Sequence, residues 1–323
     1  MVIGAIGVAS LLATTDAFGA AREHNYRDYA PGEGQGSAAD TTPLEDQRIV
    51  VAIDAMLGFG SSTTGEPSAN SLGKPITVLA DHSVYAESFI GTLRVDVAKN
   101  WNLRASLPFT YMSFEATTGR RLGGAAAGNA SLEADHRFFS SDAVDQWAIL
   151  ALFAPTAQGT PPPSGELGPE QENIVNTYFA NQTALRVRGY EQLAPWAYDR
   201  WAIVPRYLVT SPPRRPGVTY EGSIALESLF DTSGDASAKY AARFSGWLRG
   251  GWAFDDVVDV ALRVGYGIPL HGTGEDHPAL AIEPQLRLVG PRLTALLGLL
   301  VPLSGGATDP RFTSIHAAVS ARF

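Results

Sequence analysis

Residues 101–115 alternate between apolar and polar side chains, and this alternation constrains the fold more than any other feature of the chain. The stretch reads WNLRASLPFTYMSFE, with large or apolar residues at Trp101, Leu103, Ala105, Leu107, Phe109 and Tyr111. A period of two is that of a β-strand, and the stretch is longer than the typical soluble strand of about 5–6 residues. The apolar face must therefore pack either on a protein core or against lipid.

The same alternation recurs from residue 48 to the end of the chain. Thirteen segments show it: 48–60, 83–98, 101–115, 129–138, 145–154, 177–189, 197–209, 218–230, 238–252, 257–270, 279–289, 292–303 and 311–323. Because no segment longer than a turn or two has helical spacing, the sequence predicts an all-β protein.

The connections between these segments fall into two kinds. Residues 99–100, 254–256 and 290–291 form very short turns, whereas 60–82, 116–128, 155–175 and 271–278 form long polar loops. Short turns on one rim and long loops on the other are typical of bacterial outer-membrane barrels, which have an even number of strands. When alternating up and down directions are assigned to the strands from each end of the chain, the two assignments disagree between residues 210 and 238. We therefore expect one candidate within 195–252 not to be a separate strand, or one strand to have been missed, which gives twelve strands with fourteen as the alternative.

Three features favour lipid outside the sheet over a soluble sandwich, which also alternates. The strands are long, and aromatic residues lie near strand ends, where they can meet lipid headgroups (Trp101, Tyr111, Phe138, Trp147, Trp201, Tyr266 and Phe323). The polar face carries charges of both signs: Arg94, Asp96, Arg104, Glu133, Asp135, Arg137, Asp259, Arg263, Glu283 and Arg287. The predicted fold is a transmembrane antiparallel up-and-down β-barrel in which these ten residues line the pore.

The two ends of the chain indicate export to the bacterial outer membrane. The apolar stretch VIGAIGVASLLATT is followed by the small residues AFGAA, which predicts a signal peptide over 1–20, although no Lys or Arg lies between Met1 and Asp16. Residues 21–47 are polar and predict a flexible periplasmic lead-in, followed by the barrel over 48–323. The chain ends on Phe323, the usual final residue of such barrels, which predicts contact with the outer-membrane assembly machinery.

The sequence offers little for catalysis. The net charge of −9 without a Lys/Arg block argues against nucleic acid as a partner, and the absence of cysteine excludes disulfides and thiolate chemistry. His82 and Ser83 are adjacent, but neighbours on a strand point to opposite faces, so they do not form a catalytic pair. The acidic loop 275–277 beside His271 is expected to be solvated, and His316 to line the pore. We therefore expect no catalytic residue, no metal site and no cofactor.

Four stretches carry a family resemblance: LPFTYMSF (107–114), GNASLEADHRFF (128–139), GYGIPLHGTG (265–274) and LGLLVPLSGG (297–306). Over residues 48–323 the chain resembles the outer-membrane transporter family associated with the meta-pathway of phenol degradation, a relative of the long-chain fatty-acid channels. It departs from that family at Gly128-Asn129-Ala130-Ser131, where a Gly-x-Gly-Asp turn is typical. The resemblance implies passive uptake of small hydrophobic or aromatic molecules.

The expected function is therefore a channel with membrane lipid and a small-molecule solute as partners, filtered by the loops 60–82 and 155–175. Two alternatives stay open at this point: a barrel enzyme that acts on lipid, and a non-conducting structural or adhesion barrel.

Overall fold

The computed structural model describes residues 49–69, 75–115, 121–141, 143–157, 180–181, 183–188, 192–211, 216–232, 240–254, 257–272, 278–290, 292–304 and 311–323. The predicted signal peptide and lead-in, most of the loop 155–175 and the acidic loop 275–277 lie outside these residues. The strands are β1 (Ile49–Ala69), β2 (Pro75–Ala98), β3 (Trp101–Glu115), β4 (Arg121–Ala127), β5 (Ser131–Ser140), β6 (Asp145–Phe153), β7 (Arg200–Thr210), β8 (Gly217–Asp231), β9 (Tyr240–Ala253), β10 (Val258–His271), β11 (Ala279–Val289), β12 (Leu293–Pro302) and β13 (Arg311–Arg322).

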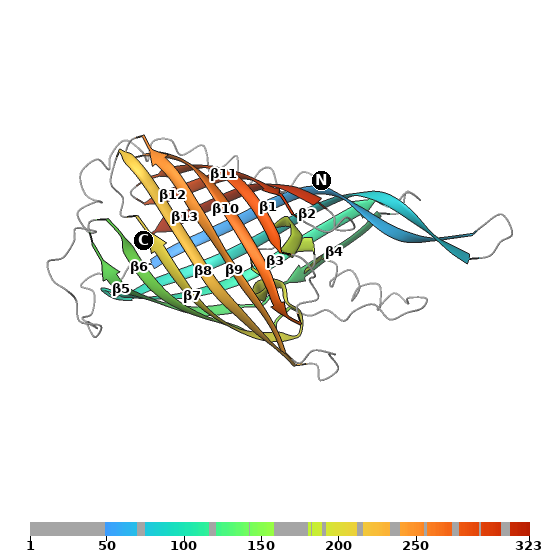
Figure 1. Ribbon diagram of the computed structural model, residues 1–323, viewed down its shortest axis with the longest axis horizontal. Helices are drawn as coiled ribbons and strands as arrows, with labels where there is room; N and C mark the ends of the chain where they lie inside the picture. The colour runs from blue at the N-terminus through green and yellow to red at the C-terminus, as the bar shows by residue number, and fades with distance from the viewer. Residues whose placement is uncertain are drawn as a thin grey trace.

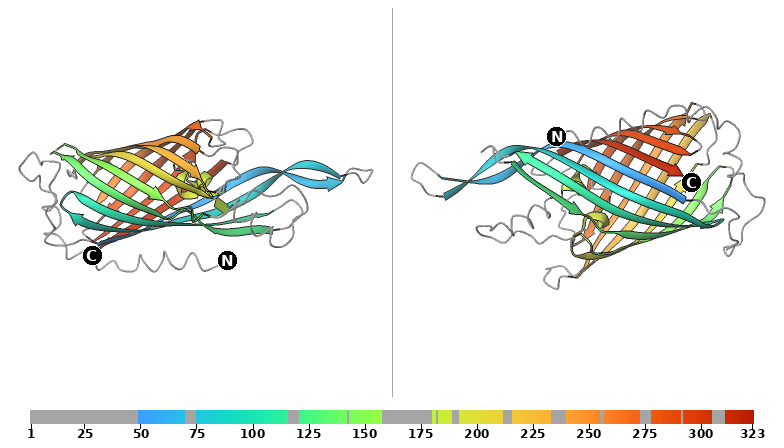
Figure 2. Two further views of the ribbon diagram at one scale, coloured as in Figure 1. Left: turned by 90° about the horizontal axis from the view of Figure 1, so that it is seen from below. Right: turned by 180° about the vertical axis from the view of Figure 1, so that it is seen from behind.

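The strands form one closed antiparallel barrel (Figures 1 and 2). Each strand from β5 to β12 pairs with the next along the chain, β13 pairs with β1, and β1 pairs with β2. The pairings of β2 with β3 and of β3 with β5 complete the ring. The predicted fold class is confirmed.

Two short strands share one position in the wall. β5 pairs with the first half of β3 up to Ser106–Ser131, and β4 pairs with the second half from Phe109–Ala127 onward. Four steps from Ala127 to Ser131 thus lie opposite three steps of β3, which marks an irregularity at residues 128–130. The thirteen strands of the sheet therefore make twelve wall positions, the expected number.

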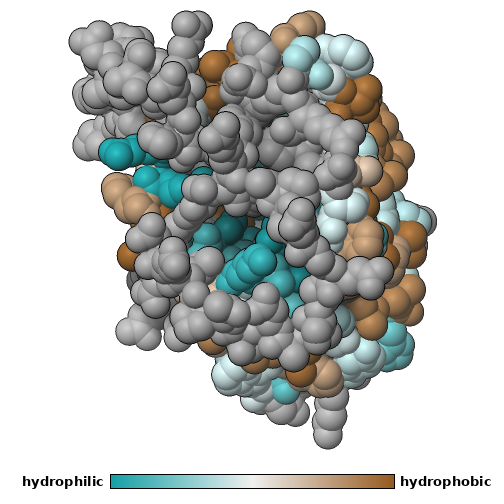
Figure 3. Space-filling model, turned by 90° about the vertical axis from the view of Figure 1, so that its left-hand side faces the viewer, coloured by the Kyte–Doolittle hydropathy of each residue, from teal (hydrophilic) through white to brown (hydrophobic). Residues whose placement is uncertain are grey.

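The side chains of the apolar face point outward from the barrel, not toward a protein core. On β3, Leu107 is 59% exposed, while Thr110 and Met112 are buried inside the barrel. Figure 3 shows apolar side chains along the flank of the barrel and hydrophilic ones within the opening at one end. A closed sheet with this arrangement pairs its backbone and presents apolar side chains to lipid. One predicted belt residue is wrong: Trp147 turns inward, where the Arg137 guanidinium lies 5.5 Å from its ring centre.

The two ends of the barrel differ as the sequence predicted, with two corrections. The start of β1, the end of β13 and the short turns share one end, and Ile49 and Phe323 exchange two backbone hydrogen bonds there. The predicted loop 60–82 is mostly strand, because β1 continues to Ala69 and β2 begins at Pro75. Beyond Ser61 and Ser83 these strands pair only with each other and form a ribbon that projects from the barrel (Figures 1 and 2). The predicted loop 116–128 likewise contains β4.

The predicted strand at 177–189 is wrong. Its described part is helical over residues 183–187 and lies inside the barrel, where its side chains are buried on several sides. The expectation that one candidate within 195–252 is not a separate strand is also wrong, because β7, β8 and β9 are all strands of the barrel wall. No helix within the described ranges is long and apolar enough to cross a membrane.

Candidate functional site

The connection between β6 and β7 carries a segment that folds into the barrel, and we refer to its described residues between 180 and 199 as the insert. Its helical turn ends where the Arg188 amide donates to the Ala184 carbonyl (3.1 Å). The short 3-10 helix η3 (Ala194–Trp196) follows, and Trp196 is only 1% exposed. The insert thus occupies the interior of the half of the barrel that bears the long connections.

Two apolar clusters hold the insert against the wall. The insert contributes Ala180, Leu185, Val187, Leu193 and Trp196. The wall contributes, among others, Met56, Met112, Phe153, Val204, Leu229 and Phe312. Inward-facing apolar residues of the wall are therefore covered by protein at this level of the lumen.

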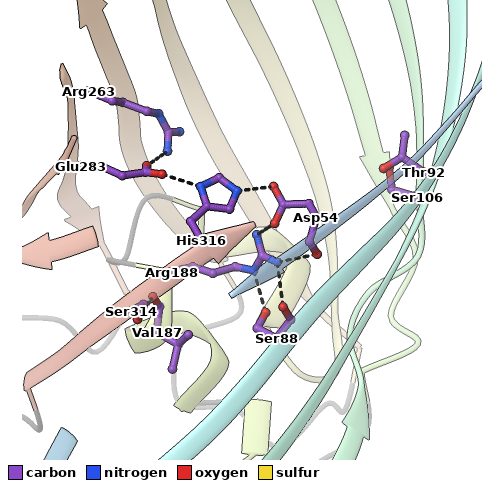
Figure 4. Close-up of polar contacts among 10 residues, drawn as sticks. All are labelled: Asp54, Ser88, Thr92, Ser106, Val187, Arg188, Arg263, Glu283, Ser314 and His316. Atoms are coloured by element: carbon purple, nitrogen blue, oxygen red, sulfur yellow. Dashed lines mark hydrogen bonds and ion pairs between the residues drawn. The ribbon is translucent and has the colours of Figure 1, made fainter. Parts of the chain in front are cut away.

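Arg188 fastens the insert to β1 and β2 (Figure 4). Its guanidinium forms an ion pair with Asp54 (2.8 Å) and donates from Nε to the Ser88 hydroxyl (2.6 Å). A second nitrogen donates to the backbone carbonyls of Asp54 (3.3 Å) and Ser88 (3.2 Å). The planar guanidinium thereby joins two wall strands to the end of the helical turn.

Asn129 forms a second attachment, at the irregularity between β4 and β5. Its Nδ2 donates to the carbonyls of Ala194 (2.8 Å) and Ala197 (2.6 Å), and its amide donates to the Pro195 carbonyl (2.7 Å). Its Oδ1 accepts from the Ala157 amide (2.8 Å). The position at which the sequence departs from the resembled family is thus where the wall binds η3.

Glu227 on β8 forms the third attachment. One of its oxygens accepts hydrogen bonds from the amides of Leu193 and Ala194, both at 2.7 Å. These amides precede or begin η3, so the buried carboxylate satisfies backbone donors at the start of the helix.

Two wall glycines make room for the insert. A Cβ atom on Gly58 would collide with a γ-methyl of Val187 and lie 3.2 Å from Phe312. A Cβ atom on Gly128 would collide with the Pro195 carbonyl and lie 3.1 Å from Trp196. A side chain at either position would push the insert away from the wall.

The end of the insert is tied to the rim of the barrel. Asp199 has a φ of 52°, its amide donates to the Ala157 carbonyl (3.1 Å), and its carbonyl accepts from the Thr232 amide (2.9 Å). Burial, together with the nearby carboxylate of Asp231, raises the pKa of Asp199.

Between the insert and the short turns, the lumen carries two ion-pair networks. The first lies on β2, β3, β5, β6 and β7. Its pairs are Arg94–Asp96 (2.8 Å), Arg104–Asp135 (2.9 Å), Arg104–Glu133 (3.7 Å), Arg206–Glu133 (3.5 Å) and Arg137–Asp145 (4.0 Å).

The second network lies on β1, β8, β9, β10, β11 and β13 and reaches the insert through Arg188. Its pairs are Arg249–Asp259 (2.9 Å), Arg249–Glu221 (3.5 Å), Arg287–Glu221 (2.8 Å), Arg263–Glu283 (3.0 Å), His316–Glu283 (2.5 Å), His316–Asp54 (3.0 Å) and Arg188–Asp54 (2.8 Å). Both ring nitrogens of His316 face carboxylate oxygens (Figure 4). The imidazolium form donates from both nitrogens, so this arrangement fits a positively charged His316.

All ten predicted pore-lining residues belong to these two networks, and their side chains lie inside the barrel. Their role in lining a conducting pore stays a prediction. Six further charged residues face the interior but were not predicted: Asp54, Arg188, Arg206, Glu221, Glu227 and Arg249. All five wall residues among them, Asp54, Arg206, Glu221, Glu227 and Arg249, occupy the inward positions of their strands, so counting every second residue would have found them. Arg188 had no such signal, because its segment is not a strand.

A cavity of about 270 Å³ lies between the insert and the second network. Arg188, Gln192, Pro195 and Trp196 of the insert line one part. The wall lines the rest with Asp54, Met56, Ile90, Glu221, Trp247, Arg249, Arg263, Gln285, Arg287, Leu296 and His316. The cavity thus combines charged side chains with two indole rings.

The three histidines whose side chains are described have other contacts than a serine nucleophile. His136 stacks on Trp101 with ring centres 4.3 Å apart, and His271 stacks on Tyr240 at 6.1 Å. His316 is held by two carboxylates. Among the described residues, no group of three or more His, Asp or Glu side chains is placed to hold a metal ion.

No protein-family model and no curated protein matches the chain. Among solved structures, the fold is similar to that of the COG4313 outer membrane channel from Pseudomonas putida F1, with a TM-score of 0.51, 13% identity, and coverage of 89% of this chain and 100% of that chain. It is also similar to the translocator domain of the autotransporter NalP from Neisseria meningitidis, with a TM-score of 0.43, 12% identity, and coverage of 99% and 95%. For a Pseudomonas aeruginosa FadL homologue the TM-score is 0.38 at 10% identity, with coverage of 93% and 98%. The chain therefore has the fold of an outer-membrane β-barrel.

Proposed function

We propose that the protein is a passive channel for small molecules in the bacterial outer membrane. The observation that carries the proposal is the lumen itself. Its turn-side half is lined by charged side chains rather than by a packed apolar core, and it opens into a cavity of about 270 Å³ beneath the insert. A barrel that served only as an anchor has no need of this lining, whereas a polar wall sets the selectivity of a pore. The fold it shares with a solved outer-membrane channel supports the same proposal.

We propose transport rather than lipid hydrolysis as the activity of the barrel. An ester-cleaving barrel needs a histidine within hydrogen-bond reach of a serine hydroxyl. His136, His271 and His316, the histidines with described side chains, are engaged in ring stacking or carboxylate contacts instead.

In place of the predicted filter loop 60–82, the proposal assigns the filter to the insert; most of the other predicted filter loop, 155–175, lies outside the described residues. The ribbon formed by β1 and β2 projects away from the barrel, whereas the insert lies across the lumen and is attached through Arg188, Asn129 and Glu227. In this proposal the insert sets the size limit for solutes on the side of the long connections.

A second candidate function rests on the same insert. If the insert never moves, the barrel is closed and serves a structural role. The apolar contacts of Trp196 and Val187 favour such a closed state.

Conductance separates the two candidates. We would record purified, folded protein in planar lipid bilayers beside the variant Arg188→Met, which removes the attachment to Asp54 and Ser88. The channel predicts conductance in the wild type and a larger value in the variant. If neither protein conducts, while heat-modifiable gel mobility shows that both are folded, the result contradicts the channel and supports the closed barrel.

We also propose that the outer-membrane assembly machinery recognises Phe323. Phe323 is 76% exposed and follows β13, next to the pairing of β13 with β1 that closes the barrel.

A further inference from the structure

We propose that the cavity beneath the insert binds a small organic carboxylate with a flat apolar body. This inference rests on the proposed channel function and names the class of solute that would pause there. It is carried by the charge, the aromatic lining and the size of the cavity.

Guanidinium groups dominate the charged lining. Arg188, Arg249, Arg263 and Arg287 line the cavity, whereas Asp54 and Glu221 are its described carboxylate lining. The other two acidic members of the second network, Asp259 and Glu283, are buried, and so is Arg249, whose side chain is 1% exposed. A solute in the cavity therefore meets three partly exposed guanidiniums, those of Arg188, Arg263 and Arg287, and two partly exposed carboxylates, those of Asp54 and Glu221.

His316 adds to this excess of positive charge. Its imidazolium shares Asp54 and Glu283 with Arg188 and Arg263. The second network thus joins four guanidiniums and one imidazolium to four carboxylates. An anionic solute would add a carboxylate to this set.

Arg287 is the residue best placed to hold the carboxylate. Its side chain is 25% exposed, and it forms an ion pair with Glu221 at 2.8 Å. The guanidinium carries five N–H donors in a planar fork, so the pair with Glu221 leaves donors for a second carboxylate.

The rest of the lining suits a flat apolar body. Met56, Ile90, Pro195, Trp196, Trp247 and Leu296 line the cavity. The guanidinium of Arg263 lies over the ring of Trp247, 4.9 Å from its centre, so a charged group is held against an aromatic ring in the lining. A ring that packs on the apolar part of the lining can place its carboxylate toward the arginines.

The size of the cavity sets the scale of the solute. A dry cavity of about 150 Å³ is enough for a benzene molecule. The volume of about 270 Å³ therefore holds one ring with a carboxylate, and it is small by the standard of sites for larger ligands.

The test is a calorimetric titration of the folded protein with benzoate, benzyl alcohol and benzylammonium, which share the ring and differ in charge. We expect benzoate to bind at least about tenfold more tightly than the other two, because hydrogen bonds to charged groups carry the difference. Equal affinities for benzoate and benzyl alcohol overturn the proposal.

Arg287→Gln tests the residue, and Arg94→Gln is its matched control. Arg94 is equally exposed (26%) and has an ion pair of the same length, 2.8 Å with Asp96, but it does not line the cavity. We expect Arg287→Gln to weaken benzoate binding by at least about tenfold, to leave benzyl alcohol unchanged, and to retain heat-modifiable mobility. Equal losses in the two variants refute a specific role for Arg287.

Flux measurements on liposomes separate this inference from the proposed channel. Flux without preferential binding of benzoate rejects the binding site and leaves the channel standing. Benzoate binding that depends on Arg287, without flux of any solute, supports the site and rejects the channel.

Discussion

At the scale of single residues, each wall strand has a lipid side and a lumen side, and a substitution should act according to its side. Leu107 lies in the middle of β3 and faces outward. We predict that Leu107→Arg lowers the free energy of unfolding by about 2–4 kcal/mol, because a charge at the middle of the bilayer loses its hydration. Urea unfolding of the protein folded into lipid vesicles measures this value. Leu107→Phe is the control and should behave as wild type; equal stability of the two variants would show that Leu107 does not face lipid.

Gly58 tests the contact between wall and insert. We predict that Gly58→Val increases solute flux several-fold, because its side chain takes the space of the Val187 γ-methyl group and displaces the insert. Liposome swelling measures the flux. Gly250→Val, at a position where a Cβ meets nothing within 4 Å, is the matched control and should leave flux unchanged. If both variants match the wild type, the insert is not the barrier.

At the scale of elements, a disulfide between the insert and β1 tests whether the insert moves. A Cβ at Gly58 would lie against the γ-methyl groups of Val187, which brings a cysteine pair at these positions within reach of a disulfide. Since the chain has no cysteine, Gly58→Cys with Val187→Cys introduces the only thiols. We predict that oxidation lowers flux and that a reducing agent restores it. Flux that is indifferent to oxidation, with the cross-link shown by mass spectrometry, contradicts a moving insert; the single Gly58→Cys variant controls for the substitution.

At the scale of the whole molecule, a closed hydrogen-bonded ring should resist detergent until it is heated. We predict that the protein, recovered in outer-membrane fractions, migrates differently on SDS gels before and after boiling, because all wall strands separate in one step. A protein found in the soluble fraction with one mobility would contradict the barrel.

Assembly is also a property of the whole chain. We predict that removal of Phe323 lowers the amount of folded protein in the outer membrane while the purified variant still folds in detergent, because its ring projects from the barrel and packs on little of it. Cell fractionation with the same gel assay measures both quantities. Equal levels of wild type and variant would remove the proposed role in assembly.

Much of the wall could be predicted from the sequence because apolar and polar residues alternate with a period of two along each strand. The alternation in 101–115 correctly placed Leu103 and Leu107 outside and Arg104 inside, and twelve strands were expected. The insert could not be predicted in this way. The alternation over 177–189 predicts a strand, whereas the described part of this segment is helical and buried inside the barrel, which alternation along the chain does not encode.

The sequence by itself therefore determined the barrel, its two faces and the side on which the predicted lumen charges lie. These properties follow from local geometry, since each residue's side is set by its neighbours along the strand. Only the tertiary structure decided which charges pair, that Gly128 leaves room for η3 while Asn129 binds it, and that Arg188 reaches Asp54 on β1. These contacts join residues far apart in the chain, and their partners are fixed by the closure of the ring and by the fold of the insert within it, which no local pattern encodes.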